Sequence, residues 1–193
     1  MENKLLTIAC LLLLALAPTA CWKKSTSSTN RLPALTTSGL NTMGCLVNGQ
    51  LFVPQEPAAV PYPFYSATLT HDPADNLNMG WKDEKNSCDQ SSIGIRLDSV
   101  KLTQGTTYKL TQQVDTSNAA ANVGQWAEYL DITSCSQFIF SPYYTTAAVT
   151  GQVTITYYNP TLGVVSGTFW FDAIDAGGDT VHVREGRFDM STN

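Results

Sequence analysis

The chain has 193 residues, with sixteen acidic and eleven basic side chains, which gives a formal net charge of −5 at pH 7. From Met43 onward there are fifteen acidic and seven basic side chains, and this balance excludes nucleic-acid binding, which requires a basic stripe. Without an N-terminal leader and tether, about 150 residues are left, which suits one domain with a single core.

The N-terminus has the pattern of a secretory signal peptide. Lys4 supplies a positive charge, and an almost wholly apolar segment follows from Leu5 to Ala17. This segment is too short to cross a bilayer as a helix. Conventional cleavage after Ala17 or after Ala20 would leave Pro18 in an unfavourable position near the cut. We therefore predict that residues 1–20 are a lipoprotein signal peptide.

Residues 18–21, Pro-Thr-Ala-Cys, resemble the short box that precedes the acylated cysteine of bacterial lipoproteins. The resemblance implies that Cys21 is lipidated and that membrane lipid is its partner. The leucine usual three residues before the cysteine is absent, and relaxed boxes of this kind are typical of Bacteroidota lipoproteins. Cys10 is a rival acceptor of the lipid, but it would leave too short an apolar segment before it. The alternative to a lipoprotein is a soluble secreted protein with a leftover cysteine. Two or more acyl chains make such attachment nearly permanent.

Residues 21–42 are predicted to be the lipidated cysteine and a flexible tether. Serine and threonine dominate this stretch, which cannot bury enough apolar surface to offset its ordering entropy. Lys23 and Lys24 suit anionic headgroups, whereas lipoproteins exported to the surface of the same bacteria often carry acidic residues there. We expect a lipid-anchored protein of the bacterial cell envelope, at the outer membrane, with the periplasmic or surface face left open.

Residues 43–193 are predicted to form one all-β domain, because period-two alternation is frequent and helical periodicity is nearly absent. Asn48-Gly49 predicts an early hairpin. A second hairpin is expected between Tyr65 and Trp81. The other expected segments are strands at residues 93–97, 106–111 and 136–140, the last ending before Pro142, a loop at 113–124, and a strand or single helical turn at 125–130.

The C-terminal part predicts a three-stranded meander at about residues 151–158, 164–174 and 180–190. In its middle strand Phe169 and Phe171 face the core, which leaves Trp170 on the opposite face in need of cover. In its last strand the inward-facing set changes from odd to even positions, so Glu185-Gly186 is expected to be a β-bulge with Gly186 in the unusual conformation. Further along the same strand, Arg187 and Asp189 are expected to form a small ion pair on the outer face.

Nine to eleven antiparallel strands in one domain must curl or split into layers. We therefore predict a single antiparallel β-sandwich or flattened β-barrel built from hairpins and a meander, with a calycin-like barrel as the alternative.

Two motifs are similar to an uncharacterised family of Bacteroidota envelope lipoproteins, a domain of unknown function. The opening motif is Gly-Cys-x-Val-Asn-Gly at residues 44–49, and the closing motifs are Gly-Thr-Phe at 167–169 and Gly-Arg-Phe-Asp at 186–189. The similarity covers about residues 40–190. It implies a β-rich lipoprotein and no particular activity.

Three cysteines follow Cys21 in the chain, and an oxidising compartment allows them to form a disulfide. Cys88 and Cys135 lie in polar, loop-like segments, and we predict that they pair. Cys45 lies in a strand-like segment, where a buried free thiol packs as a small hydrophobe. A disulfide that includes Cys45 is the alternative.

No motif for catalysis stands out. There is no Gly-x-Ser-x-Gly and no glycine-rich phosphate loop. His71 and its neighbouring acids fit a turn better than a metal site, His182 is expected to face solvent, and the acidic segment 83–89 fits a solvated loop better than a calcium loop. We expect no enzyme activity, no cofactor and no metal.

Aromatic residues are the better indication of binding, because exposed rings on a β scaffold stack on sugars or bind peptides, although they also pack over sheet ends. We expect a non-catalytic binding or accessory module with a protein or glycan partner. The alternatives are a lipocalin-like carrier of a small apolar or glycan ligand and, third, a glycan-active enzyme. The candidate ligand-contact residues are Tyr62, Phe64, Tyr65, Trp126, Tyr143 and Tyr144.

Overall fold

The computed structural model describes residues 31–54, 65–70, 74–86, 89–112, 123–132 and 140–192. These residues contain eleven β-strands and no helix, so none of them forms a helix that could cross a membrane. In chain order the strands are β1 (Thr42–Val47), β2 (Gln50–Phe52), β3 (Tyr65–Thr70), β4 (Asp75–Asn86), β5 (Asp89–Val100), β6 (Thr107–Leu110), β7 (Gln125–Ile132), β8 (Phe140–Tyr144), β9 (Gly151–Asn159), β10 (Val164–Ile174) and β11 (Thr180–Ser191).

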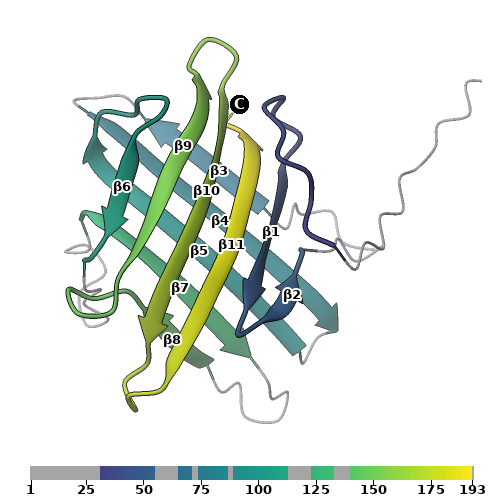
Figure 1. Cartoon of the computed structure of the whole chain (residues 1–193), viewed down its shortest axis with the longest axis vertical. Coiled ribbons are helices and arrows are strands. Elements are labelled where there is room, and N and C mark those ends of the chain that lie inside the picture. The colour runs from purple at the N-terminus through teal and green to yellow at the C-terminus, as the bar shows by residue number, and fades with distance from the viewer. Residues whose placement is uncertain are drawn as a thin grey trace, which may run out of the picture.

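The strands form one antiparallel sheet that folds into two layers crossing one another (Figure 1). One layer has the order β2-β1-β11-β10-β9-β6 and the other the order β8-β7-β5-β4-β3. The layers join at a corner where Ile174 of β10 pairs with Tyr144 of β8. The predicted all-β antiparallel sandwich is confirmed. The barrel alternatives are wrong, because β2 and β3 end the strand order without pairing to each other.

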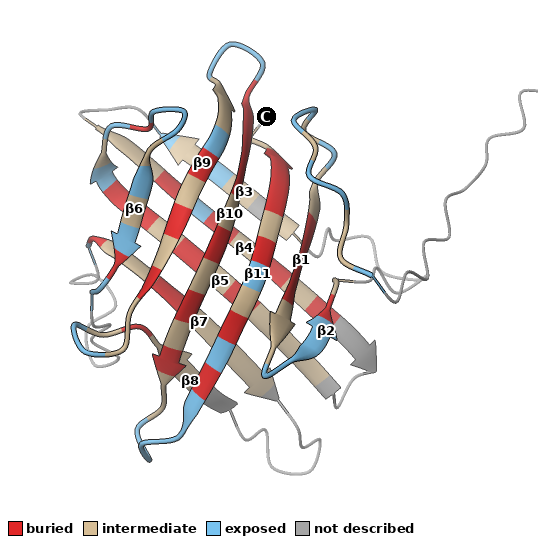
Figure 2. Cartoon of the chain, viewed as in Figure 1, coloured by how far each residue is buried: buried red, intermediate tan, exposed pale blue. Residues whose placement is uncertain are grey.

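The space between the two layers is filled by apolar side chains. Buried residues alternate with half-buried or exposed ones along the first half of β9, the second half of β10 and the start of β11 (Figure 2). At the centre the ring of Trp81 stacks on Phe169, with centroids 6.1 Å apart, and lies 6.0 Å from Phe188. The indole nitrogen of Trp81 donates a hydrogen bond to the sulfur of Met190. Burial of each large side chain of this kind stabilises the fold by roughly 1.5–3 kcal/mol.

Both predicted hairpins are present. Asn48 and Gly49 have φ angles of 50° and 80°, the left-handed pair that a two-residue turn between β1 and β2 requires. In the second hairpin β3 pairs with β4 so that Ala67 lies opposite Met79, and both face the core.

In two segments the structure decides what the sequence left open or predicted wrongly. Residues 125–130 belong to a strand, β7, and not to a helical turn. The strand expected at 136–140 is predicted to end before Pro142, but the described strand β8 (Phe140–Tyr144) includes Pro142, which lies opposite Leu130 of β7. A proline is tolerated there because β8 pairs with β10 only at Tyr144, so the missing N–H faces an unpaired edge among the described strands. Residues 113–122 and 133–139 lie outside the described residues.

The predicted β-bulge in β11 is confirmed, but its geometry differs from the expectation. Two residues of β11, Arg184 and Glu185, lie opposite Trp170 of β10. Glu185, and not Gly186, takes the left-handed conformation, with a φ of 53°. Gly186 is required for another reason: a Cβ there would lie 2.5 Å from the ring of Phe169.

Trp170 lies on the outer face, as predicted, and the next strand provides its cover. The guanidinium group of Arg184 lies 5.4 Å from the centre of the Trp170 ring, in cation–π geometry. Arg184 also forms an ion pair of 2.6 Å with Asp172, and the same carboxylate oxygen lies 2.7 Å from Nδ1 of His182. His182 is exposed on this face, as its position between two buried valines predicts.

Asp189 is 1% exposed and does not form the predicted ion pair with Arg187. Its carboxylate is a buried acceptor that holds residues 33–41, which we call the docked segment. Arg187 donates instead to the carbonyl of Pro33. The donors to Asp189 are the hydroxyls of Thr36 and Ser166 and the backbone amides of Ser38, Gly39 and Leu40. The second half of the predicted 21–42 tether therefore contacts β11, while residues 21–30 lie outside the described residues.

Candidate functional site

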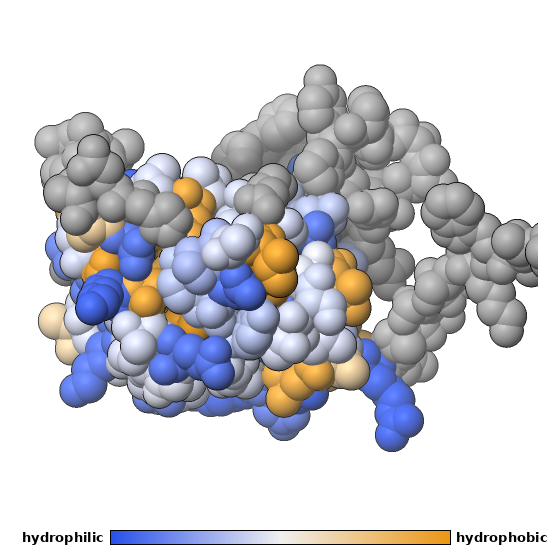
Figure 3. Space-filling model, turned by 90° about the horizontal axis from the view of Figure 1, so that it is seen from above, coloured by the Kyte–Doolittle hydropathy of each residue, from blue (hydrophilic) through white to orange (hydrophobic). Residues whose placement is uncertain are grey.

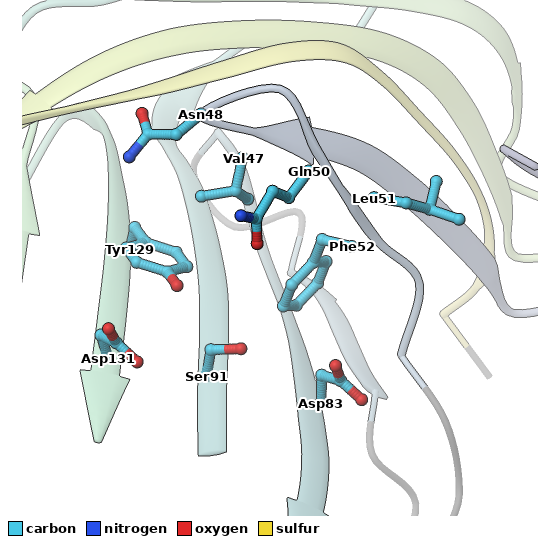
Figure 4. A pocket seen from close by; sticks show the side chains of 9 residues that line it. All are labelled: Val47, Asn48, Gln50, Leu51, Phe52, Asp83, Ser91, Tyr129 and Asp131. Carbon is cyan, nitrogen blue, oxygen red and sulfur yellow. The ribbon is translucent and has the colours of Figure 1, made fainter. Parts of the chain in front are cut away.

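A polar cavity of about 250 Å³ lies between the β1–β2 hairpin and the ends of β4, β5 and β7 (Figure 4). We call it the hairpin pocket. The described residues that line it are Val47, Asn48, Gln50, Leu51, Phe52, Asp83, Ser91, Tyr129 and Asp131.

The floor of the hairpin pocket is a row of polar side chains that continues the core-facing side of three strands. Along β4 the inward side passes from Trp81 to Asp83, and along β7 it passes from Tyr129 to Asp131. Ser91 of β5 pairs with both acids, so the order across the sheet is Asp83, Ser91, Asp131. Because neighbouring strands lie about 4.8 Å apart, the backbones of the two acids are separated by about 10 Å.

The roof of the hairpin pocket is the β1–β2 hairpin. Gln50 lies two residues before buried Phe52 and so points to the same side, whereas Leu51 points away (Figure 4). The turn is held in place by Asn48, whose side-chain oxygen accepts a hydrogen bond of 2.9 Å from the backbone amide of His182. The backbone amide of Asn48 donates in return to the carbonyl of His182, at 2.8 Å. The roof is therefore fixed to β11 by two hydrogen bonds.

The electrostatics of the hairpin pocket are set by its two carboxylates. Asp83 is 8% exposed, although it lies at the end of the core. Burial, and next the charge of Asp131, raises the pKa of Tyr129 to about 12, so this hydroxyl is neutral at pH 7. The pocket thus presents carboxylates, neutral hydroxyls and side-chain amides beside the rings of Phe52 and Tyr129.

This arrangement suits hydrogen bonding better than covalent chemistry. Ser91 has no histidine among the described lining residues to act as its base, since His182 lies on the outer face of β11. The described residues contain no group of three or more histidine, cysteine, aspartate or glutamate side chains that could hold a metal. Carboxylates, amides and ring faces together are the groups that recognise hydroxyl-bearing ligands.

The described aromatic candidates do not form one patch. Tyr65 begins β3, is half-buried and packs against the core. Trp126 and Tyr144 meet edge-on on the outer face, with ring centroids 6.3 Å apart. Tyr143 points to the inner side, where its ring lies 6.0 Å from that of Tyr129. Their contact with a ligand stays a prediction, and Tyr143 approaches the hairpin pocket only through Tyr129.

Several other predicted site residues lie outside the described residues: Cys21, Tyr62, Phe64, Cys88, Cys135 and His71. Among the described residues Cys45 is a buried free thiol, as predicted, and burial raises the pKa of that thiol.

None of the residues that line the hairpin pocket is among the ligand-contact residues predicted from the sequence. The segment from Asp83 was expected to be a solvated loop, but β4 continues to Asn86 and Asp83 faces inward. The period-two alternation that places Trp81 inward also reaches Asp83 and could have indicated this. That Asp83 and Asp131 line the same pocket, however, depends on the pairing of β5 with both β4 and β7, which the sequence does not reveal.

Comparison with known proteins gives one match. A family model described as Domain of unknown function (DUF6252) matches residues 89–190, which is more than half of the chain. The match contains the two closing motifs at 167–169 and 186–189, while the opening motif at 44–49 lies before it. No curated protein and no solved structure matches the chain. This match confirms the predicted resemblance to an uncharacterised domain family. The chain belongs to the family of this domain of unknown function.

Proposed function

We propose that the protein is a lipid-anchored lipoprotein of the bacterial cell envelope, of the Bacteroidota type, whose β-sandwich is a non-catalytic module that binds a small hydroxyl-rich ligand such as a sugar. The observation that carries the binding function is the hairpin pocket, which brings two carboxylates, two hydroxyls and two side-chain amides around one cavity. Ring faces of Phe52 and Tyr129 suit the apolar face of a sugar.

The anchored part of the proposal rests on the N-terminal sequence. The apolar segment, the box that ends at Cys21 and the serine-rich stretch after it are the pattern of a lipoprotein leader and tether. An outer-membrane location is proposed on the same basis.

A lipocalin-like carrier is a weaker candidate. Such a carrier holds its ligand inside a barrel, whereas here the sheet is open and the space between its layers is filled by a continuous cluster of buried side chains. On the face seen in Figure 3, hydrophobic residues form small separate patches between hydrophilic ones, without a broad apolar mouth.

Glycoside hydrolysis is the second candidate function, because Asp83 and Asp131 flank one pocket and such enzymes use a pair of carboxyl groups. Binding ranks first, because a general acid of this type needs an apolar environment that keeps it protonated. The described lining of the pocket is instead mostly polar.

The proposed function is tested with the full chain in detergent and a panel of monosaccharides, by saturation-transfer NMR and by an assay for released reducing sugar. We expect binding without turnover. Gln50→Ala should weaken binding about threefold to tenfold, as expected for one lost hydrogen bond.

The matched control is Gln104→Ala, the same substitution at an exposed glutamine that does not line the pocket. This variant should bind as the unmodified chain does. Absence of binding to every sugar would refute the proposal, and turnover that Asp83→Asn abolishes would replace it with hydrolysis.

A further inference from the structure

The β1–β2 hairpin has a second face, opposite to the one that roofs the hairpin pocket. Leu46 of β1 and Leu51 of β2 are cross-strand partners on this second face. They point outward because the neighbouring pair, Cys45 and Phe52, is buried in the core. Figure 4 shows the side chain of Leu51 pointing away from that of Gln50, and Leu51 is 39% exposed. The hairpin therefore presents an apolar surface on its outer side.

The docked segment, which runs along β1, extends this apolar surface (Figure 1). Pro33 packs on Gly44 of β1, where a Cβ would lie 2.4 Å from Cδ of Pro33 and 3.3 Å from Cγ2 of Val53. Leu35, two residues after Pro33, is also exposed. We call this surface the tether-side patch, which consists of Pro33, Leu35, Leu46, Leu51 and Val53.

Exposed apolar side chains gather in this part of the molecule. The described residues have five exposed large apolar side chains, and three of them, Leu35, Leu40 and Leu51, lie within residues 33–52. The other two are apart from one another, Val123 before β7 and Leu162 on the turn between β9 and β10. Exposed apolar side chains that gather on one surface mark a site of contact with a partner or a membrane.

Arginine side chains border the tether-side patch. Arg184 and Arg187 of β11 pair with residues of β1, and Arg31 is exposed just before the docked segment. The described acids that are exposed or half-buried beside them are Asp172, which forms an ion pair with Arg184, and Glu185 in the bulge. Long arginine side chains reach headgroup phosphates while their apolar stems lie along an apolar surface. This border is therefore suited to an anionic lipid surface, although the chain as a whole has a net charge of −5.

The proposed lipid anchor lies a short link away from the tether-side patch. Residues 22–32 join the docked segment at Pro33 and span at most about 40 Å when fully extended. Lys23 and Lys24 add two cations to this link. Because the link joins the domain at the edge of the patch, anchoring raises the effective concentration of this surface at the bilayer. A contact that would be weak for a free domain is then sufficient.

We infer, building on the proposed anchor, that the tether-side patch lies against the surface of the bilayer that holds Cys21. Exposed leucines suit the boundary between headgroups and acyl chains, and the bordering arginines suit the phosphates above it. The domain then has a fixed orientation. The hairpin pocket, on the other face of the same hairpin, is directed away from the membrane and toward a ligand that arrives from the aqueous side.

The inference is tested with the lipidated chain, purified from membranes and reconstituted into vesicles of phosphatidylcholine and phosphatidylglycerol. A bimane fluorophore is attached to Leu51→Cys, and a doxyl-labelled lipid serves as the quencher. Quenching at position 51 should be about threefold or more stronger than at the control position, because a side chain at the boundary of headgroups and acyl chains lies within reach of the quencher. In vesicles of phosphatidylcholine alone the quenching should weaken, and equal quenching in both would overturn the role of the arginines.

The matched control is Gln104→Cys, an exposed position on the turn between β5 and β6, outside the tether-side patch. The unmodified chain, treated in the same way, gives the background labelling of its own cysteines, and circular dichroism checks the fold of each variant. Equal quenching at both positions in protein that floats with the vesicles would overturn the inference and leave the anchor standing. Failure to float would overturn both. Protection of position 51 from iodide without quenching by the lipid would assign the patch to a second copy of the chain and overturn the inference.

Discussion

Asp189 is the residue whose side chain joins distant parts of the described chain: its carboxylate accepts hydrogen bonds from residues 36–40 and from Ser166. Burial raises the pKa of this carboxyl, but hydrogen bonds from Thr36, Ser166 and the backbone amides of Gly39 and Ser38 outweigh burial, and the pKa lies below its usual value. The ionised form is therefore the one that the folded protein stabilises. Hydrogen bonds to a charged acceptor are roughly twice as strong as neutral ones.

Asp189→Asn should lower the free energy of unfolding by about 2–3 kcal/mol at pH 7, because an amide nitrogen would face donors that now meet an oxygen. The folded pKa is depressed, so the contribution of Asp189 is fully present above the unfolded value of about 3.9 and is lost as the pH falls through the folded value. Urea denaturation at pH 7 and pH 3 checks this. The difference between the two proteins should shrink at pH 3.

The control for this comparison is Asp179→Asn, which removes the same charge from an exposed position. It should change stability by less than about 0.5 kcal/mol. If Asp189→Asn were as stable as the unmodified protein at both pH values, the role assigned to Asp189 would be wrong.

At the scale of elements, strand pairing determines which hairpins and loops lie together at one end of the sheet. The β1–β2 hairpin covers the polar ends of β4, β5 and β7 because Asn48 is fastened to His182 of β11. At the same ends of the strands, Gln90 of β5 pairs with Ile132 of β7. The segments that carry Cys88 and Cys135 start next to this pair.

We expect Cys88 and Cys135 to form a disulfide, because the paired residues Gln90 and Ile132 bring their flanking segments to the same end of adjacent strands. Non-reducing peptide mapping by mass spectrometry should find this pair, with Cys45 as a free thiol. Reduction should lower the free energy of unfolding by about 2–4 kcal/mol, since the bond closes a long loop.

Cys45 serves as the internal control, because it is buried and should react with an alkylating reagent only after unfolding. A peptide that joins Cys45 to either of the other two cysteines would contradict the predicted pairing.

At the scale of the whole molecule, the docked segment shortens the proposed link to the membrane. Its first residue, Pro33, is already held by Arg187. The link from Cys21 then consists of residues 22–32, which span at most about 40 Å when fully extended. The domain is therefore expected to stay close to the bilayer.

Cys21→Ser should move the protein from the membrane fraction to the soluble fraction, because the proposed acyl chains are then lost. Fractionation of cells followed by immunoblotting measures this. Cys10→Ser is the matched control, since Cys10 is the rival acceptor, and this variant should stay in the membrane fraction. Retention of Cys21→Ser in the membrane would contradict the proposed anchor.

Local pattern was sufficient for most of the strands and for the apolar side chains of the C-terminal strands that face the core. Period-two alternation predicts the inward positions of Phe169 and Phe171 and the bulge in β11, because burial of alternate side chains is a local property of an extended segment. Asn48-Gly49 predicts its turn for an equally local reason, the left-handed conformation of both residues.

Only the tertiary structure decided what the polar residues do. The sequence predicts that Asp189 is an outer-face partner of Arg187, yet it is buried beneath residues about 150 positions away. Asp83 and Asp131 share a pocket because β5 lies between β4 and β7, and this order follows from the packing of the whole sheet. The sequence by itself therefore determined an all-β chain with its inward faces. The layers and the pocket depended on long-range pairing, which no local pattern encodes.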